Sequence, residues 1–391
     1  MVSSKNIKRQ DITQDNYKVE NNTMADDRFR TLQELASDIN KKMKAPILIL
    51  GSEARQEVPH LTTGILAYDL ALGGGWAKNQ WNEIVGLESS GKTALCYKTI
   101  AANQALDPNF IALWVAAEEY VPSYASSFGV DLDRMWVIET NEMEPALDLV
   151  LKAVSNRAVD LVVLDSLPAM VTVTEMNKDM DEPSVATGAQ ILSRFFKKSA
   201  VAQRRSLTDE ERGCTMIAIN QWRDKIGVMF GDPRTTPGGK AKNYYFFTRM
   251  EVTNAEWIKE SSSIEDRVGQ TIKTRVFKNK TYRPQQVAQV DFYFADTKNG
   301  AFKMGQFDTI KDMVNVCLSL GVIERRGATY SFKENTWRGK DCATTIIPAA
   351  VREDLDLQRD LWESAFAAVA ERDTMTAPVS DLAYEDEDEQ D

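Results

Sequence analysis

The sequence of 391 residues has little of what zinc sites and disulfide frameworks require. Its four cysteines form no C-x-x-C pair, and His60 is the single histidine. No apolar run approaches the roughly 18 residues that a membrane helix needs, and the polar first ten residues lack the apolar core of a secretory signal. We therefore predict a cytosolic protein with no membrane contact and with neither structural zinc nor disulfides.

Negative charge dominates the composition, but it is distributed unevenly. The formal net charge is −11, and seven acidic residues stand among residues 381–391, which leaves −4 for the rest of the chain. Residues 273–283 hold five basic residues and no acidic one, and a second basic group lies between residues 223 and 242. A basic surface beside an acidic tail is typical of a regulated nucleic-acid binder. The alternative is an ordinary solvated surface.

Composition and hydrophobic periodicity divide the chain into segments. Apolar residues spaced three and four apart from Phe29 to Met43 predict a helix, and the apolar run at residues 46–50 predicts a short strand. The predicted segments are a polar extension at 1–24, a helix-strand arm at 25–60, a main domain at 61–304, a small C-terminal domain at 305–372 and an acidic tail at 373–391.

The main domain alternates short β-type runs with helical segments. In chain order the runs cover residues 81–85, 110–115, 135–138, 161–164 and 215–219. Such alternation predicts an α/β fold in which helices cover both faces of a mostly parallel sheet, with ligands outside the carboxyl ends of the strands. Later runs follow one another directly and predict an antiparallel extension of the sheet, at 244–252, 271–277 and 287–294. The C-terminal domain is predicted as α+β, with helices at 310–320 and 349–369 and a hairpin at 322–332.

One motif directly after the first of these strands predicts the binding of a nucleoside triphosphate. Residues 86–93, Gly-Leu-Glu-Ser-Ser-Gly-Lys-Thr, satisfy G-x-x-x-x-G-K-[ST], and a helical segment follows, which is the context that the motif requires. The glycines let backbone N–H groups turn towards phosphate oxygens, Lys92 adds a positive charge, and the Thr93 hydroxyl is a ligand for Mg²⁺. The alternative is a structural glycine turn.

Acidic residues end two further predicted strands at the same edge of the sheet. Asp165 follows the fourth apolar run and is predicted to hold the magnesium ion together with Thr93. Glu118 and Glu119 follow the second run and face the same crevice, where hydrolysis needs a residue that orients the attacking water. We favour Glu118 for this role, although Glu119 and a merely solvated pair remain alternatives.

A long run after the last parallel strand carries a family resemblance. Residues 220–239 begin Asn-Gln-Trp-Arg-Asp-Lys-Ile-Gly-Val-Met-Phe-Gly and end in Pro-Gly-Gly, and they resemble the second DNA-binding loop of the RecA family of homologous-recombination ATPases. Shorter resemblances follow the same order along the chain, at residues 61–64, 69–73, 88–93, 278–280 and 330–332. The first DNA-binding loop of the family corresponds to residues 175–185, where the similarity is low.

The resemblance implies a RecA-like P-loop core with a small N-terminal oligomerisation arm and a small C-terminal domain. The implied activity is ATP-dependent strand exchange by a helical filament of this chain on single-stranded DNA, with ATP and Mg²⁺ as cofactors and duplex DNA as a second partner. The implied location is the cytoplasm of a bacterial or phage-infected bacterial cell. Two rival interpretations are a ring helicase of the same fold and a passive single-stranded-DNA-binding protein with a vestigial P-loop.

The functional residues of the family carry over position by position. Gln221 resembles the residue that senses the γ-phosphate at the root of the second loop, and Lys278 and Lys280 resemble lysines that reach a neighbouring subunit's ATP. With Lys92 and Glu118 they form the implied catalytic set. The implied nucleotide-binding residues, with Tyr124 resembling an adenine-stacking tyrosine, are Gly86, Glu88, Ser89, Ser90, Gly91, Lys92, Thr93, Ala94, Tyr124 and Asp165. The implied DNA contacts, with Ile226 resembling a wedge between base triplets, are Lys197, Arg223, Lys225, Ile226, Gly238 and Gly239.

Overall fold

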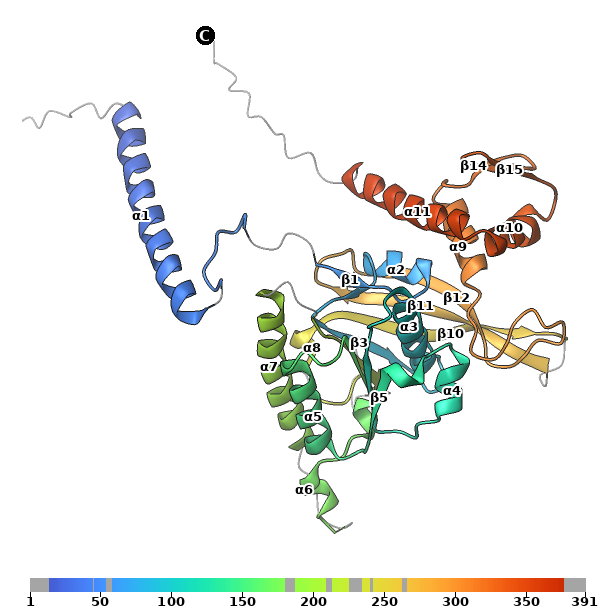
Figure 1. The fold of residues 1–391 in the computed structure, drawn as a ribbon, viewed down its shortest axis with the longest axis horizontal. Coiled ribbons are helices and arrows are strands. Elements are labelled where there is room, and N and C mark those ends of the chain that lie inside the picture. The colour runs from blue at the N-terminus through green and yellow to red at the C-terminus, as the bar shows by residue number, and fades with distance from the viewer. Residues whose placement is uncertain are drawn as a thin grey trace, which may run out of the picture. The chain divides into compact units, whose positions relative to one another are not determined.

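The chain divides into two compact units, Met1–Val58 and Pro59–Asp391. Figure 1 shows the computed structural model, which describes residues 14–44, 46–53, 58–179, 187–208, 213–224, 234–239, 242–261 and 266–375. Lys225, Ile226 and the acidic stretch 381–391 lie outside the described residues. Within the described ranges, no helix has both the length and the apolar character to cross a bilayer.

The first unit contains the long helix α1 (Gln14–Met43). The helix predicted from Phe29 to Met43 is confirmed, but α1 begins at Gln14, inside the segment that we predicted as an extension. No glycine or proline stands in residues 1–24, so nothing in their composition breaks the helix. Five large apolar side chains in the described part of α1 remain exposed, namely Phe29, Leu32, Leu35, Ile39 and Met43.

The strand predicted at residues 46–50 is wrong, because these residues form an irregular segment and pair with no strand in the described parts of the chain. A side-chain amide of α1 takes up their backbone groups instead. The Oδ1 atom of Asn40 accepts hydrogen bonds from the N–H groups of Ile47 and Leu48, at 2.7 and 2.9 Å, and its Nδ2 atom donates to the Leu48 carbonyl at 2.8 Å. Apolar sequence alone therefore does not make a strand without a neighbouring strand to pair with.

The second unit is built around a large sheet. Among the described residues its eight strands lie in the order β12 (Gln286–Tyr293), β11 (Arg267–Asn279), β10 (Phe246–Lys259), β3 (Trp81–Gly86), β7 (Thr215–Gln221), β6 (Leu161–Asp165), β4 (Ala112–Ala116) and β5 (Met135–Glu139). The strands from β10 to β5 pair in parallel, whereas β11 and β12 pair antiparallel. The predicted α/β class, a mostly parallel sheet with an antiparallel extension, is confirmed.

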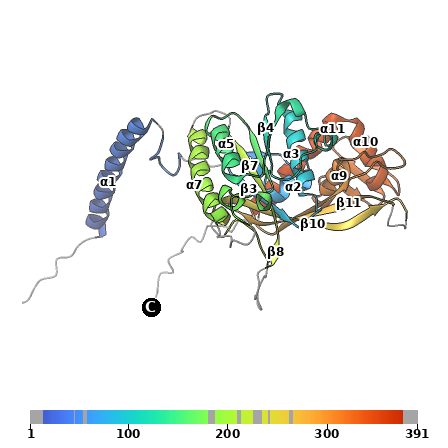
Figure 2. The same cartoon turned by 90° about the horizontal axis from the view of Figure 1, so that it is seen from below.

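Helices cover both faces of this sheet because the central strands are apolar on both sides. Helix α3 (Lys92–Leu106) packs in the core on one face, whereas α5 (Met143–Ser155) and α7 (Thr187–Thr208) pack in the core on the other. Figure 2 shows the strands between these two layers. The shorter elements of the unit are β1 (His60–Leu61) and its partner β2 (Trp76–Ala77), α2 (Leu66–Leu72), α4 (Pro122–Ser127), η1 (Leu132–Arg134), η2 (Leu167–Ala169), α6 (Val173–Met176), β8 (Arg223–Asp224) and its partner β9 (Arg234–Thr235), and α8 (Lys242–Tyr245).

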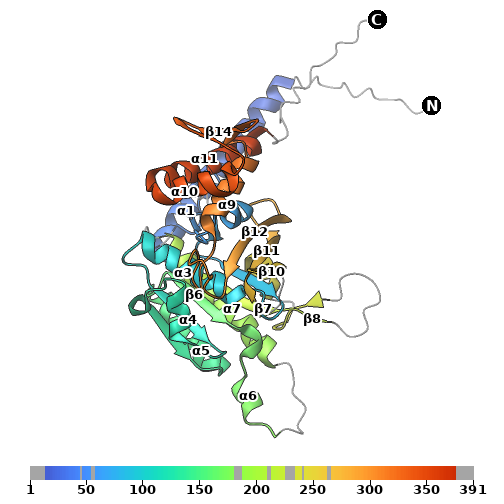
Figure 3. The same cartoon turned by 90° about the vertical axis from the view of Figure 1, so that its right-hand side faces the viewer.

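A smaller core follows the sheet, and Figure 3 shows its helices beyond β12. Its elements are α9 (Thr309–Ser319), β13 (Glu324–Arg326), β14 (Thr329–Phe332), β15 (Asn335–Arg338), the π-helix η4 (Cys342–Ile346), α10 (Ile347–Glu353) and α11 (Leu355–Met375). The single helix predicted at 349–369 is wrong. Asp354 is extended between α10 and α11, and its carboxylate accepts a hydrogen bond from the Leu357 N–H at 2.9 Å, so it starts a second helix.

Candidate active site

The phosphate-binding loop joins the buried strand β3 to helix α3, and two of its glycines are required by geometry. A Cβ atom on Gly86 would lie 2.3 Å from the carbonyl oxygen of Val252. Gly91 has a φ of +97°, and a Cβ atom there would lie 2.4 Å from Cδ1 of Ile272. The backbone of β10 and the side chains of β11 thus press on the loop and hold it at the start of α3, where backbone N–H groups are available for an anion.

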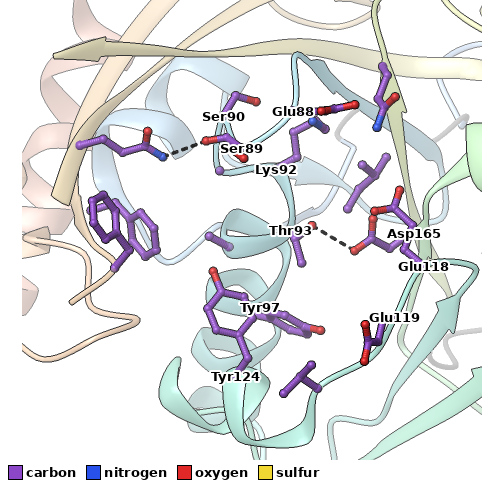
Figure 4. A pocket seen from close by; sticks show the side chains of 18 of the residues that line it. Glu88, Ser89, Ser90, Lys92, Thr93, Tyr97, Glu118, Glu119, Tyr124 and Asp165 are labelled. Atoms are coloured by element: carbon purple, nitrogen blue, oxygen red, sulfur yellow. Dashed lines mark hydrogen bonds between the residues drawn. The ribbon is translucent and has the colours of Figure 1, made fainter. Parts of the chain in front are cut away.

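A cavity of about 640 Å³ opens over this loop. Its lining extends from the carboxyl ends of β4, β6 and β7 to the three antiparallel strands, and Figure 4 shows most of the side chains that project into it. The predicted site residues that line it are Glu88, Ser89, Ser90, Gly91, Lys92, Thr93, Ala94, Glu118, Glu119, Tyr124, Asp165 and Gln221. Residues from five different segments of the chain therefore meet at one cavity.

Oxygen and nitrogen groups that suit a magnesium-bound triphosphate converge at one end of the cavity. The Thr93 hydroxyl donates to Oδ2 of Asp165 at 3.0 Å, and Lys92 Nζ donates to the Leu87 carbonyl at 2.6 Å. The buried hydroxyl of Ser90 has no hydrogen-bond partner within the part of the chain that the structure describes. A hydroxyl and a carboxylate at hydrogen-bond distance are the oxygen donors that Mg²⁺ prefers, so the residues present fit this ion.

Burial shifts the titration of both charged groups at this end. The pKa of Asp165 is raised to about 7 by its burial and by the negative charge of Glu118, although the hydrogen bond from Thr93 opposes the shift. Burial also lowers the pKa of Lys92. Each group therefore lies where an opposite charge would stabilise its ionised form, a cation beside Asp165 and phosphate beside Lys92.

Two glutamates follow β4, and they differ in position. Glu118 accepts a hydrogen bond from the Ser166 hydroxyl, which directly follows Asp165. Figure 4 shows Glu118 beside Asp165 and Glu119 apart from both. The geometry places Glu118 nearer to the predicted magnesium ligands.

The opposite end of the cavity is aromatic, and most of it was missed by the sequence analysis. Tyr124 lies edge-on to Tyr97, with ring centroids 6.0 Å apart. Gln270 donates from Nε2 to the carbonyl of Ser89 at 3.3 Å, which ties β11 to the phosphate-binding loop. The lining residues that sequence reasoning did not identify are Tyr97, Val121, Ile219, Trp257, Gln270, Phe292 and Phe294. Trp257, Gln270 and Phe292 are brought to the cavity by strand register, which a linear motif does not contain.

Gln221 connects the cavity to the segment that resembles a DNA-binding loop. It ends β7, where it pairs with Gly86 of β3, and its side chain lines the cavity. Two residues later the exposed Arg223 lies in β8 and pairs with Thr235 of β9. Strands β8 and β9 form the stem of the segment 225–233, which lies outside the described residues.

The other predicted DNA contacts that the structure describes lie on α7 or close to it. Lys197 is exposed on this helix. A Cβ atom on Gly238 would lie 3.0 Å from Leu192, and one on Gly239 would lie 3.2 Å from Ala189. The two glycines, which follow β9 in the chain, therefore pack close to α7.

Two buried or half-buried ion clusters, also missed by the sequence analysis, include residues close to the stem in the chain, and the second of them binds a stem residue. In the first, the fully buried Glu83 of β3 accepts from Arg249 Nε at 2.5 Å and from Asn220 Nδ2 at 2.9 Å, and its carboxylate lies 3.4 Å from Lys242 Nζ. In the second, Glu251 binds the side chains at both ends of the stem and a third on β11. Its partners are Trp222 at 3.0 Å, Arg234 at 2.5 Å and Arg275 at 2.7 Å.

Lys278 lies near the end of β11 and Lys280 directly follows that strand, and neither lines the cavity of their own chain. Lys278 Nζ donates to the carbonyl of Asn243 at 2.5 Å, and Lys280 Nζ donates to that of Tyr244 at 3.4 Å. Burial and the positive charges of Lys280 and Arg249 lower the pKa of Lys278 to about 8. One chain therefore does not bring this pair to its own triphosphate site.

A phosphate-binding loop, a buried aspartate and a glutamate at the carboxyl edge of a mostly parallel sheet define the P-loop class of nucleoside-triphosphate-binding proteins. Residues 30–299 match the family model of the RecA N-terminal domain. Protein RecA of Synechocystis sp. is 36% identical over 348 residues, covering 86% of this chain and 93% of the relative. Protein RecA of Arthrospira platensis is 35% identical over 84% of this chain and 86% of its own length, and that of Streptococcus equi subsp. equi is 32% identical over 93% and 94%. The chain belongs to the RecA family.

Proposed function

We propose that this chain is an ATP-dependent recombinase that forms helical filaments on single-stranded DNA and exchanges strands with a homologous duplex. The observation that carries the proposal is the position of Gln221, which lines the triphosphate cavity and lies two residues from the stem of the loop that resembles a DNA-binding loop. The relatives reported above are all RecA proteins, and no ring helicase or passive DNA binder is among them.

ATP binding and hydrolysis follow from the polar end of the cavity. Thr93 and Asp165 would hold Mg²⁺, which when bound neutralises charge on the phosphate oxygens. Lys92 Nζ, whose present acceptor is a backbone carbonyl, would donate to phosphate oxygens instead. Glu118, held by Ser166, would orient the attacking water and accept its proton. These groups together support ATP hydrolysis as the reaction, and the position of Gln221 between the cavity and the loop stem supports its dependence on DNA.

The DNA contacts and the filament rest on residues outside this cavity. Arg223, with Lys197, Lys225 and the N–H groups of Gly238 and Gly239, would bind phosphates without reading sequence, and Ile226 would separate base steps. Lys278 and Lys280 would act on the ATP of a neighbouring subunit, because they lie away from the cavity of their own chain. The cytoplasmic location and the domain boundaries at residues 61, 305 and 373 stay predictions.

The test is the rate of ATP hydrolysis with and without single-stranded DNA, measured beside electron microscopy of the complex. The proposal expects hydrolysis that DNA stimulates, together with helical filaments. Rings with directional unwinding would support a helicase instead, and DNA binding without turnover would support a passive binder. The variant Lys92→Ala serves as the control for contaminating ATPase.

A further inference from the structure

Trp257 lies at the aromatic end of the cavity, and neither the phosphate chemistry nor the DNA contacts use it. It stands on β10 in register with Gln270 of β11, which in turn is in register with Phe292 of β12. Cross-strand neighbours on one face of a sheet are held at fixed separations. We call Trp257, Gln270 and Phe292 the cross-strand row. Since Gln270 donates to the Ser89 carbonyl at 3.3 Å, the row places the indole of Trp257 at a fixed position relative to the phosphate-binding loop.

The indole is held in place but not covered. The guanidinium of Arg267 lies 4.5 Å from the centre of the Trp257 ring, and Phe294 meets that ring at 76° with centroids 6.3 Å apart. Trp257 nevertheless keeps 43% of its surface exposed and lines the cavity. A rigid aromatic surface at the edge of a cavity is suited to a planar ligand, because it loses little rotational freedom when the ligand stacks.

The side-chain amide of Gln270 is already engaged. The Nε2 atom of Gln270 donates to Ser89, and its Oε1 atom accepts from Asn254. The row therefore offers a planar ligand its ring surfaces and one donor, the indole N–H of Trp257, which can meet the N3 or N7 acceptor that both purines carry. The hydroxyls of Tyr97 and Tyr124, which also line the cavity, can each donate or accept, so they also do not select one edge of a base.

We propose that Trp257 is a base-stacking residue of the nucleotide site, which holds the nucleobase through its ring and without selecting between adenine and guanine. This inference rests on the proposed function, since it takes a nucleoside triphosphate as the ligand of the cavity. Tyr124, which resembles an adenine-stacking residue, is then one of two aromatic side chains that contact the base.

The experiment compares ligands with and without a base on the full chain. Dissociation constants for ATP, GTP and inorganic tripolyphosphate, each with Mg²⁺ and without DNA, are measured by competition against a fluorescent nucleotide. Trp257→Ala should weaken ATP and GTP equally, by about tenfold, which is the effect expected for the loss of one stacked aromatic ring. Tripolyphosphate should bind the variant and the parent chain alike.

Two further variants serve as controls. Trp257→Phe keeps a ring and should retain most of the affinity for ATP. Trp136→Ala removes an indole that is 68% exposed on the edge strand β5 and does not line the cavity. This variant should leave the dissociation constants of all three ligands unchanged.

Three results would overturn the inference. These are an unchanged affinity for ATP in Trp257→Ala, an equal loss for ATP and tripolyphosphate, which would indicate a structural role, and a loss for ATP alone, which would indicate recognition of a base edge. A parent chain that binds none of the three ligands would instead refute the proposed nucleotide-binding function, so the two failures are distinguishable.

Discussion

Glu83 is a residue at which the structure predicts a large loss of stability from the removal of one charge. It has no exposed surface, and both of its cationic partners are covered, since Lys242 is 1% and Arg249 12% exposed. The variant Glu83→Gln keeps the shape of the side chain but leaves two buried cations without their anion. Breaking a buried ion pair by removing one partner costs about 3–5 kcal/mol, and we expect a loss in this range.

Two comparisons isolate the cause of that loss. Lys242→Met leaves Glu83 paired with Arg249, so it should cost much less than Glu83→Gln. Glu324 and Arg326 form a pair of similar length, 3.0 Å, but their side chains are 57% and 84% exposed. Glu324→Gln should therefore change the free energy of unfolding by less than about 0.5 kcal/mol.

The measurement is hydrogen exchange of the β3 amides together with urea unfolding at constant m-value. The β3 amides lie in the centre of the sheet and exchange only when the sheet unfolds, so they report on this unit alone. The reasoning is refuted if Glu83→Gln and Glu324→Gln shift the β3 exchange by the same amount. It is also refuted if Lys242→Met proves as costly as Glu83→Gln.

Four further outcomes are expected. Lys92→Ala should reduce ATP hydrolysis to the blank rate, because electrostatic stabilisation dominates phosphoryl transfer. Glu118→Gln should still bind ATP with turnover lowered at least about tenfold, and normal turnover would move the role to the neighbouring glutamate. Arg223→Ala should weaken binding to single-stranded DNA equally across sequences and lower the salt slope by about one, whereas dependence on base composition would contradict a phosphate contact. Burial raises the pKa of Asp69 to about 7, above the unfolded value of about 3.9, so unfolding releases a proton between these values. The Asp69 carboxyl should then lower stability as pH rises through this window, by up to about 1.4 kcal/mol per pH unit. Because burial also raises the pKa of Asp165 and of Asp312 to about 7, Asp69→Asn should reduce the slope measured by urea unfolding by the share of one carboxyl and leave the rest, and an unchanged slope would contradict the assignment.

The parallel half of the fold was predictable from the sequence because its strands are buried on both faces. Each apolar run from 81–85 to 215–219 corresponds to a strand, with ends that differ by one or two residues. The segments around residues 46–50 and 354 were not predictable in this way. In both, one polar side chain, Asn40 or Asp354, bonds to backbone groups and decides the local structure, and hydrophobic periodicity does not register such bonds.

The two ends of the cavity also differ in how far the sequence alone predicts them. The phosphate end depends on a local turn, in which Gly86, Gly91 and Lys92 lie within seven residues of the chain, so a linear motif identifies it. The aromatic end depends on three antiparallel strands whose pairing shifts at irregularities, one of them between Asn254 and Glu256, directly before Trp257. A slip of one residue at that point would turn the indole to the other face of the sheet. The identity of the base-contacting side chains therefore follows from strand register, which is why a sequence motif can indicate that this chain binds a triphosphate without indicating what holds the base.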